Sequence, residues 1–351
     1  MNMFSKLQER LQLITDKKAP FVKAMADLFA QHEFLDKAVG IDAKTLDRQP
    51  SITPETLYVC IRERSPGNVF QGAQEDAQEF LTFLLDQLHE ELLSLKNILK
   101  WRFTQASDAD SNRDSNTSGE WLEMGKNQKV SLARTMEYDA SPISFLFFGI
   151  YRSVVKRPRA KDSVTSEPFH CISLDIDDPS VESLEGALEF MTRTELIENR
   201  TSKRLVIESA PPILIIQFKR FVFDPISGVC KLSKSISYPE TLELPEGVLY
   251  RENALHRNTP YKLFSVIYHH GWSANGGHYT CHVRQTLNEE DPWILFNDSS
   301  FTFEALDRVL MTPQSEKTGH QTCYVLVYVR IKKRIKAKAK SAPSPSHDNN
   351  T

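Results

Sequence analysis

The sequence has no apolar run that approaches the roughly 18 successive residues needed for a membrane-spanning helix. Its first residue is not followed by a basic segment and an apolar stretch, so the pattern of a secretory signal is missing as well. No CxxC pair occurs, which removes the usual ligands of a structural zinc ribbon. We therefore expect a soluble protein of the cytoplasm, with the nucleus as a second compartment, that requires no metal, cofactor or membrane.

Cysteine is scarce, and an excess of either charge is absent. The five cysteines are odd in number and widely spaced, which favours reduced thiols over a disulfide framework. The net charge of -3 names no partner, so we expect no contact with nucleic acid, and we expect a monomer. With 351 residues, 40% hydrophobic and 25% charged, the chain has the composition of an ordinary globular protein with a large core.

The first part of the chain is predicted to be helical. Apolar residues recur at helical spacing within residues 3–34 and again within 55–64. A longer helix opens near Gln74 and carries an apolar stripe. Asp76 and Glu79 lie one turn apart at its amino end, where carboxylates complement the helix dipole. The same pair could instead face a basic partner, and the local pattern leaves both interpretations open.

Beyond these helices the composition changes. Residues 104–131 are rich in Ser, Asp, Asn and Gly, which cannot recover their ordering entropy by burial, so we expect a mobile insertion within the domain. After it, residues 143–155 and 169–176 are predicted to form strands. Residues 183–193 are predicted to form a short amphipathic helix.

The second half of the sequence is strongly β. The unbroken apolar run at 211–221 predicts a strand covered on both faces. Further strands are predicted at 263–268, 278–283, 293–296 and 322–329. The predicted fold class is α+β, a helical amino-terminal part followed by a curved antiparallel sheet, in one domain over residues 1–330. The basic and then Ser/Pro/Asn-rich segment 331–351 is expected to be a disordered tail.

Two stretches carry the residues with the clearest chemistry, GGHYTCH at 276–282 and WILFNDS at 293–299. A glycine pair leaves room for another backbone beside His278. A general base also needs a group that fixes its tautomer, and Asn297 or Asp298 could provide it. A structural histidine is the alternative for His278. A metal site is another, with His269, His270 and His282, but no carboxylate or cysteine completes that cluster.

The sequence offers no evident thiol nucleophile. Cys281 is three residues from His278, and an odd offset on a strand sends two side chains to opposite faces. Cys230 and Cys323 lack a feature, such as a helix amino terminus, that would lower a thiol pKa.

Three separated motifs resemble one family. Residues 74–80 resemble the Gln box, residues 211–221 the PPxLxxxxKRF strand, and residues 269–299 the His box of the ubiquitin-specific proteases, in the branch of ubiquitin carboxyl-terminal hydrolase ten. The resemblance extends over roughly residues 21–330. It implies a papain-like fold of thumb, palm and fingers that grips ubiquitin. It also implies thiol-dependent hydrolysis of ubiquitin C-terminal isopeptide bonds.

The resemblance assigns roles position by position. His278 matches the catalytic base, Asn297 the third member of the triad, and Asp298 an acidic neighbour that supports it. The residues that match positions at the ubiquitin tail are Gln74, Asp76, Glu79 and His270. The resemblance therefore favours a basic partner, the ubiquitin tail, for the carboxylate pair at the start of the helix.

The sequence departs from the family at the nucleophile. The family's Cys box, of the type GNTCY, has no counterpart, and the chain joins the family pattern just downstream of it. We expect either an amino-terminally incomplete form of an active thiol deubiquitinase or a ubiquitin-binding module without catalysis. The zinc-binding CxxC pairs found in the fingers of many relatives are absent too.

Overall fold

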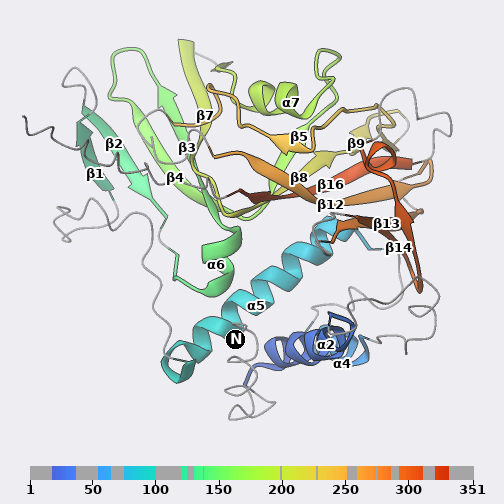
Figure 1. Cartoon of the computed structure of the whole chain (residues 1–351). Helices are drawn as coiled ribbons and strands as arrows, with labels where there is room; N and C mark the ends of the chain where they lie inside the picture. The colour runs from blue at the N-terminus through green and yellow to red at the C-terminus, as the bar shows by residue number, and fades with distance from the viewer. Residues whose placement is uncertain are drawn as a thin grey trace, which may run out of the picture.

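The computed structural model describes residues 18–36, 54–64, 75–99, 120–124, 130–136, 138–197, 200–226, 228–250, 259–273, 276–285, 292–310 and 321–331. Its helices are α2 (Pro20–Asp36), α4 (Glu55–Arg64), α5 (Ala77–Leu99), α6 (Pro142–Phe147), α7 (Leu184–Met191) and α8 (Leu306–Val309). None of these described helices is both long and apolar enough to cross a membrane. The strands form sheets of eight, six and two strands, and the predicted α+β class is confirmed (Figure 1).

The eight-stranded sheet is the centre of the molecule. Its order is β15-β14-β13-β12-β16-β8-β5, with β11 beside β12. All neighbouring pairs are antiparallel except β5 and β8. The strands are β5 (Ile172–Asp175), β8 (Ile213–Lys219), β11 (Thr241–Leu242), β12 (Tyr261–His270), β13 (His278–Arg284), β14 (Trp293–Asn297), β15 (Ser300–Glu304) and β16 (Gln321–Arg330).

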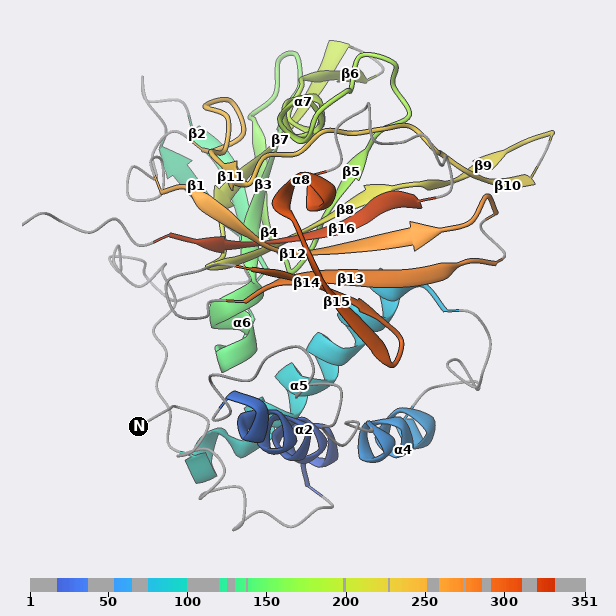
Figure 2. The same cartoon turned by 45° about the vertical axis from the view of Figure 1, so that its right-hand side comes forward.

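Both faces of this sheet are covered, which explains the unbroken apolar run in β8. Helix α7 lies on one face and α5 crosses the other (Figures 1 and 2). Leu184 of α7 belongs to the larger core cluster, and Leu85 of α5 packs with Ile215, Tyr324 and Val325. A register shift between β12 and β16 places the consecutive residues Tyr324 and Val325 in the same cluster beneath α5.

The six-stranded sheet has the order β1-β2-β4-β3-β7-β6 and projects away from the eight-stranded sheet (Figures 1 and 2). Its strands are β1 (Glu120–Met124), β2 (Val130–Thr135), β3 (Gly149–Lys156), β4 (Ser163–Phe169), β6 (Glu195–Ile197) and β7 (Thr201–Ser209). A separate hairpin of β9 (Phe221–Asp224) and β10 (Gly228–Lys231) follows β8.

Helices α2 and α4 pack with α5 on the side away from α7. Glu91 of α5 joins the three helices: its Oε2 accepts the Val22 backbone N–H at 2.9 Å, and its Oε1 lies 3.0 Å from Arg64. Burial raises the pKa of this carboxyl group. The helix predicted over residues 55–64 is confirmed, whereas residues 1–17 of the first predicted helical stretch lie outside the described residues.

Two predictions from sequence are wrong in part. The strand predicted from Ile143 begins instead with α6, because the Ser141 hydroxyl and the Ser144 side chain form a capping box and Pro142 occupies the first turn. The predicted insertion at 104–131 contains β1, which pairs with β2, because backbone pairing between strands does not require an apolar composition. Residues 101–119 and 125–129 lie outside the described residues.

Candidate active site

His278 and Asn297 come together at one end of the eight-stranded sheet. His278 is the first residue of β13 and Asn297 the last of β14, and the two strands are antiparallel. Cys281 pairs with Phe296, so His278 and Asn297 project from the opposite face. The imidazole Nε2 lies 2.6 Å from the amide Oδ1. The strand register therefore builds a pair from residues that are distant in sequence.

The hydrogen bond defines the protonation of the His278 ring. An amide oxygen can only accept, so Nε2 carries the hydrogen of the neutral ring and Nδ1 keeps its lone pair. Asn297 is exposed and the ring of His278 is half-buried, so a partner can reach the pair. The arrangement supplies a base and a group that orients it, which are two of the three elements of a nucleophilic triad.

Gly277, which precedes the base, is required by the packing behind it. A Cβ atom there would overlap the His269 ring and the His270 carbonyl oxygen. Gly271 begins the same β12–β13 turn with φ of +112°, a conformation that residues with side chains rarely adopt. The two glycines let the turn pack directly on His269, and this packing sets the position of His278.

The His269 ring is buried behind the turn. It is 3% exposed and lies edge-on to Phe221 and Tyr279, with ring centroids 5.2 and 5.0 Å away. Burial, together with the positive charge of Lys231, lowers the pKa of His269 to about 4. The ring is therefore neutral near pH 7 and supports the turn by packing.

Lys231 joins the β9–β10 hairpin to this turn. Its ammonium group donates to the carbonyl oxygens of His269 at 3.1 Å and Gly271 at 2.6 Å. Burial lowers its pKa to about 8. The same hairpin exposes large apolar side chains, Phe223 at 76% and Ile226 at 97%. Exposed apolar groups anchored next to a catalytic-type pair are typical of a site that receives a protein.

His270 stands beside the base. Its Nε2 lies 2.8 Å from the Thr280 hydroxyl, and its ring centroid is 5.9 Å from that of His278. Burial lowers its pKa, with a further contribution from His278. Within the described part of the chain, no group of three or more His, Cys, Asp or Glu side chains could hold a metal ion.

The amino end of α5 lies beneath β13 and β14 (Figures 1 and 2). Asp76 caps this helix: its Oδ1 accepts the backbone N–H groups of Gln78 at 2.8 Å and Glu79 at 3.1 Å. Its Oδ2 accepts the hydroxyl hydrogen of Tyr324. Glu79 is exposed. The two carboxylates of the motif therefore differ, because Asp76 is engaged within the molecule and Glu79 faces outward.

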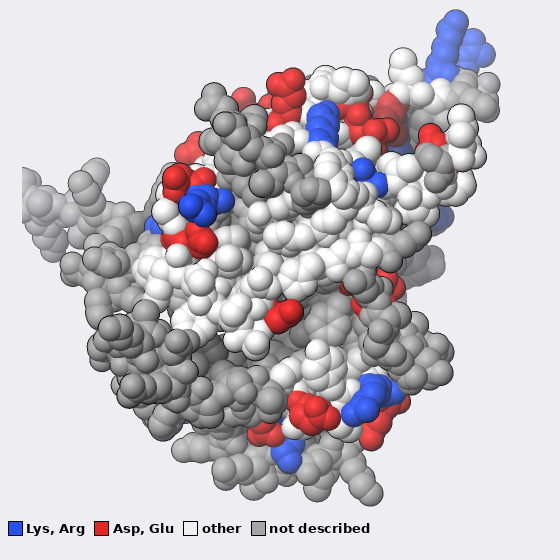
Figure 3. All heavy atoms as spheres, turned by 90° about the vertical axis from the view of Figure 1, so that its right-hand side faces the viewer, with Lys and Arg blue, Asp and Glu red and all other residues white. Residues whose placement is uncertain are grey.

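A pocket of about 250 Å³ opens beside Asp76, between the start of α5 and the end of β8. Its wall includes Tyr324 and Arg220, and the buried guanidinium of Arg220 donates to the carbonyl oxygens of Leu232 and Lys234 at 2.9 and 2.7 Å. Figure 3 shows a hollow between the sheet and the helices below it, with acidic side chains near its edges and a largely uncharged surface above.

Comparison with known proteins identifies the family. The model of the family described as ubiquitin carboxyl-terminal hydrolase matches residues 2–328. The chain belongs to the ubiquitin carboxyl-terminal hydrolase family. A probable ubiquitin carboxyl-terminal hydrolase 3 of Schizosaccharomyces pombe is 34% identical over 80% of this chain and 60% of its own length. Ubiquitin carboxyl-terminal hydrolase 10 of Xenopus tropicalis is 34% identical over 74% of this chain and 34% of its own length.

The family relationship extends to the fold. Ubp8, in the SAGA DUB module bound to monoubiquitin, superposes with a TM-score of 0.64 at 19% identity and covers 93% of this chain and 63% of its own. The same module bound to ubiquitin aldehyde gives a TM-score of 0.61 at 19% identity, over 94% and 65% of the two chains. The ubiquitin-specific protease fold expected from sequence is confirmed. The chain spans less than two thirds of the length of these relatives.

The structure places most of the residues predicted for the site. It brings Asn297 to the base, whereas Asp298 occupies the exposed β14–β15 turn with φ of +50° and has no hydrogen-bond partner among the described residues. Asp76 and Glu79 lie at the start of α5. His270 is next to the base, and Gln74 lies outside the described residues. The roles assigned to them remain predictions.

No cysteine is prepared for attack in this family site. Burial raises the pKa of Cys171 and of Cys323 to about 12, and it also raises the pKa of Cys60 and Cys281. Cys281 lies 3.2 Å from the Ser265 hydroxyl, on the face of β13 opposite the base. The fifth thiol is on β10, in the separate hairpin.

Sequence reasoning missed several residues around the site. Lys231 gave no signal, because its partners are backbone carbonyls about 40 positions away. Tyr324 was assigned only to an apolar strand, although its hydroxyl bonds both Asp76 and Gln217. Arg220 was part of the recognised KRF motif, but its buried bonds to carbonyl oxygens depend on the hairpin that follows.

Proposed function

We propose that this chain carries the base and the ubiquitin-tail groove of a thiol deubiquitinase. His278 Nδ1 would take the proton of an attacking thiol, and Asn297 would hold the ring and stabilise the resulting imidazolium through the Nε2–H hydrogen bond. The 2.6 Å pairing of an accessible histidine with an exposed asparagine, in a chain of this family, is the observation that carries the proposal.

The substrate we propose is ubiquitin joined through its carboxyl terminus. The start of α5 presents Glu79 beside the cap Asp76, and a basic peptide tail complements such a carboxylate pair. The exposed apolar tip of the β9–β10 hairpin flanks the same end of the sheet. Together these features suit an extended tail followed by a folded body. The exposed start of α5 is where the tail would lie.

The experiment attaches a Cys-box segment from a relative to the amino end of the complete 351-residue chain. The chain alone is expected to leave a fluorogenic ubiquitin substrate uncleaved, since its resolved thiols have raised pKa values. The extended chain is expected to hydrolyse it. Replacement His278→Ala should then lower kcat/KM by roughly 10³-fold or more, while Asn297→Ala should lower it less.

Two outcomes would contradict this proposal. Hydrolysis that survives His278→Ala would remove the base assignment. Tight ubiquitin binding by an extended chain that never hydrolyses would favour a ubiquitin-binding module without catalysis. That alternative has no observation of its own in its favour, because binding alone does not require His278 and Asn297 to be paired.

A further inference from the structure

The tip of the six-stranded sheet is strongly basic. Strand β3 ends at Lys156, β4 begins at Ser163, and the turn between them is basic. The neighbouring β6–β7 turn adds more basic residues at the same end, because Lys156 pairs with Ser202. All the basic side chains of this tip are exposed: Lys156, Arg157, Arg159, Lys161, Arg200 and Lys203. We call this set the basic tip.

The basic tip has few acidic neighbours. Asp162 follows the first turn, and Glu195 pairs with Lys203 across β6 and β7. Within the described part of the chain, no side chain of the basic tip forms an ion pair or hydrogen bond. The tip is therefore a concentrated cationic surface rather than one face of an internal ion-pair network.

The backbone of both turns is also unusual. Only three described residues other than glycine have positive φ, and two are in the basic tip, Arg159 at 60° and Arg200 at 59°. The third is Asp298 beside the base. Arginine has no local hydrogen-bonding advantage in this conformation, unlike asparagine or aspartate. Arginine at both positions keeps a guanidinium at the apex of each turn.

Apolar side chains and an open strand edge lie next to the charge. Strand β6 ends the sheet, so its outer edge has no partner strand among the described residues. Its Leu196 is 84% exposed and Ile197 is 47% exposed. Such an edge can accept an extended peptide by adding a strand. Residues 156–162 and 195–203 contain no aromatic side chain for base stacking, which disfavours a nucleic acid.

We propose that the basic tip and β6 dock an extended segment of a partner protein in which acidic and apolar residues alternate. The acidic side chains pair with the basic tip, and the apolar ones cover Leu196 and Ile197. The surface lies at the far end of the six-stranded sheet from His278 (Figures 1 and 2). The inference is independent of the proposed hydrolysis and adds a second site for a partner.

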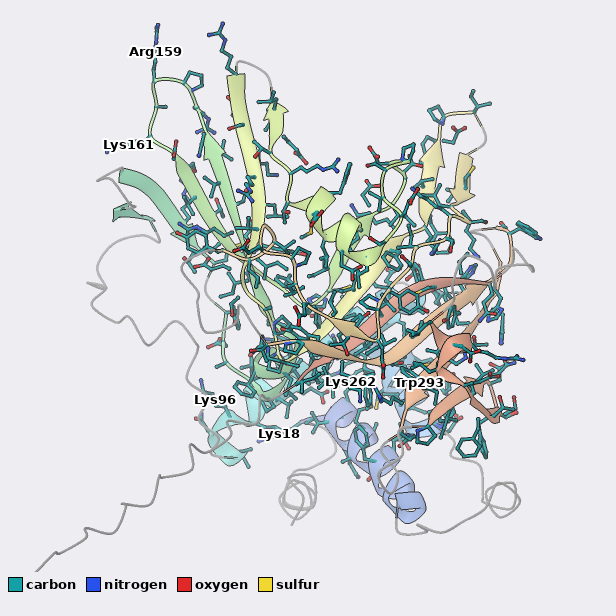
Figure 4. All side chains as sticks on the ribbon, turned by 45° about the horizontal axis from the view of Figure 1, so that its top comes forward. Lys18, Lys96, Arg159, Lys161, Lys262 and Trp293 are labelled. Atoms are coloured by element: carbon teal, nitrogen blue, oxygen red, sulfur yellow. The ribbon has the colours of Figure 1, made fainter. Side chains whose placement is uncertain are left out.

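The test measures fluorescence anisotropy of a short fluorescein-labelled peptide in which glutamate and leucine alternate, added to the complete chain. The double variant Arg159→Glu/Lys161→Glu should bind it roughly tenfold more weakly. The matched control Lys18→Glu/Lys96→Glu changes the net charge equally at exposed positions away from the tip, as Figure 4 shows. It should bind within about twofold of wild type.

Further arms make each outcome decisive. Leu196→Ser should also weaken the peptide several-fold, and all variants should retain the wild-type circular dichroism spectrum. Equal losses in tip and control variants, or no binding by the wild type, would overturn the proposal. Equal binding of single-stranded DNA would overturn it in favour of a nucleic-acid site. An equal loss of monoubiquitin affinity in the tip variant would assign the tip to the ubiquitin site instead.

Discussion

The open pair at the end of β13 and β14 and the layer directly behind it are built in opposite ways. His278 and Asn297 bond to each other and face a partner. Behind them, His269 is buried against Gly277, and Asp76 is held by a helix terminus and a tyrosine. The difference teaches that the residues which do chemistry here contribute little to stability, and that their neighbours hold them in place.

The largest expected effect is of pH on the buried layer. His269 and His282 are 3% and 4% exposed, and burial lowers both pKa values to about 4. Since the unfolded chain binds these protons more tightly, stability should fall as the pH drops from 6.5 to 4, by up to about 3 kcal/mol per ring. Urea unfolding across this range measures the loss.

The variant His282→Leu removes one of these titrating rings and keeps the site apolar. Its stability should depend less steeply on pH than that of the wild type over the same range. An identical pH dependence in the two proteins would show that the buried imidazoles are not the groups that destabilise the fold in acid.

The next effect sharpens the comparison at the glycine pair. Gly277→Ala should lower the free energy of unfolding by about 3 kcal/mol, because its Cβ would overlap the His269 ring and the His270 carbonyl oxygen. Gly228→Ala is the control: its Cβ would meet nothing, and only its φ of +79° costs about 1 kcal/mol. Equal losses in the two variants would contradict the packing argument.

A smaller effect should separate the two carboxylates at the start of α5. Asp76→Ala removes the helix cap and the Tyr324 hydrogen bond, so it should destabilise the protein by about 2 kcal/mol in urea unfolding. Glu79→Ala, at an exposed position, should stay within about 0.5 kcal/mol of wild type. If the two variants unfold alike, the contrast between engaged and open carboxylates is wrong.

The smallest effect on stability is expected in the pair itself. Asn297→Ala should change the free energy of unfolding by no more than about 0.5 kcal/mol, because the side chain is exposed. The ¹⁵N NMR signals of neutral His278 should nevertheless change from one tautomer toward a mixture, since Nε2–H loses its acceptor. An unchanged tautomer would mean that Asn297 does not orient the base.

Sequence patterns predicted most of this architecture, and the exceptions have local causes. The helix at 55–64 follows from its periodicity, and the strands bearing His278 and Asn297 follow from their apolar and aromatic runs. The run from Ile143 is apolar enough for a strand, but the capping box of Ser141 and Ser144 converts its start to α6. Cap chemistry outweighs composition over such a short segment.

The chemistry of the site was less accessible to sequence reasoning than its residue types. The motifs named His278 and Asn297, and the register of β13 and β14 is what joins them. The engagement of Asp76 with Tyr324 spans 248 positions, and it depends on the register shift between β12 and β16. Contacts of that range leave no periodic signal in a single sequence.

The central claim is that the surface bearing His278 receives the carboxyl-terminal tail of ubiquitin. NMR spectra of the chain with ¹³C-labelled histidine, recorded while ubiquitin is added, test it most directly. The account predicts that the His278 Cε1–H signal shifts with intact ubiquitin and stays in place with ubiquitin that lacks its tail. Binding of intact ubiquitin that leaves the His278 signal unmoved would contradict it.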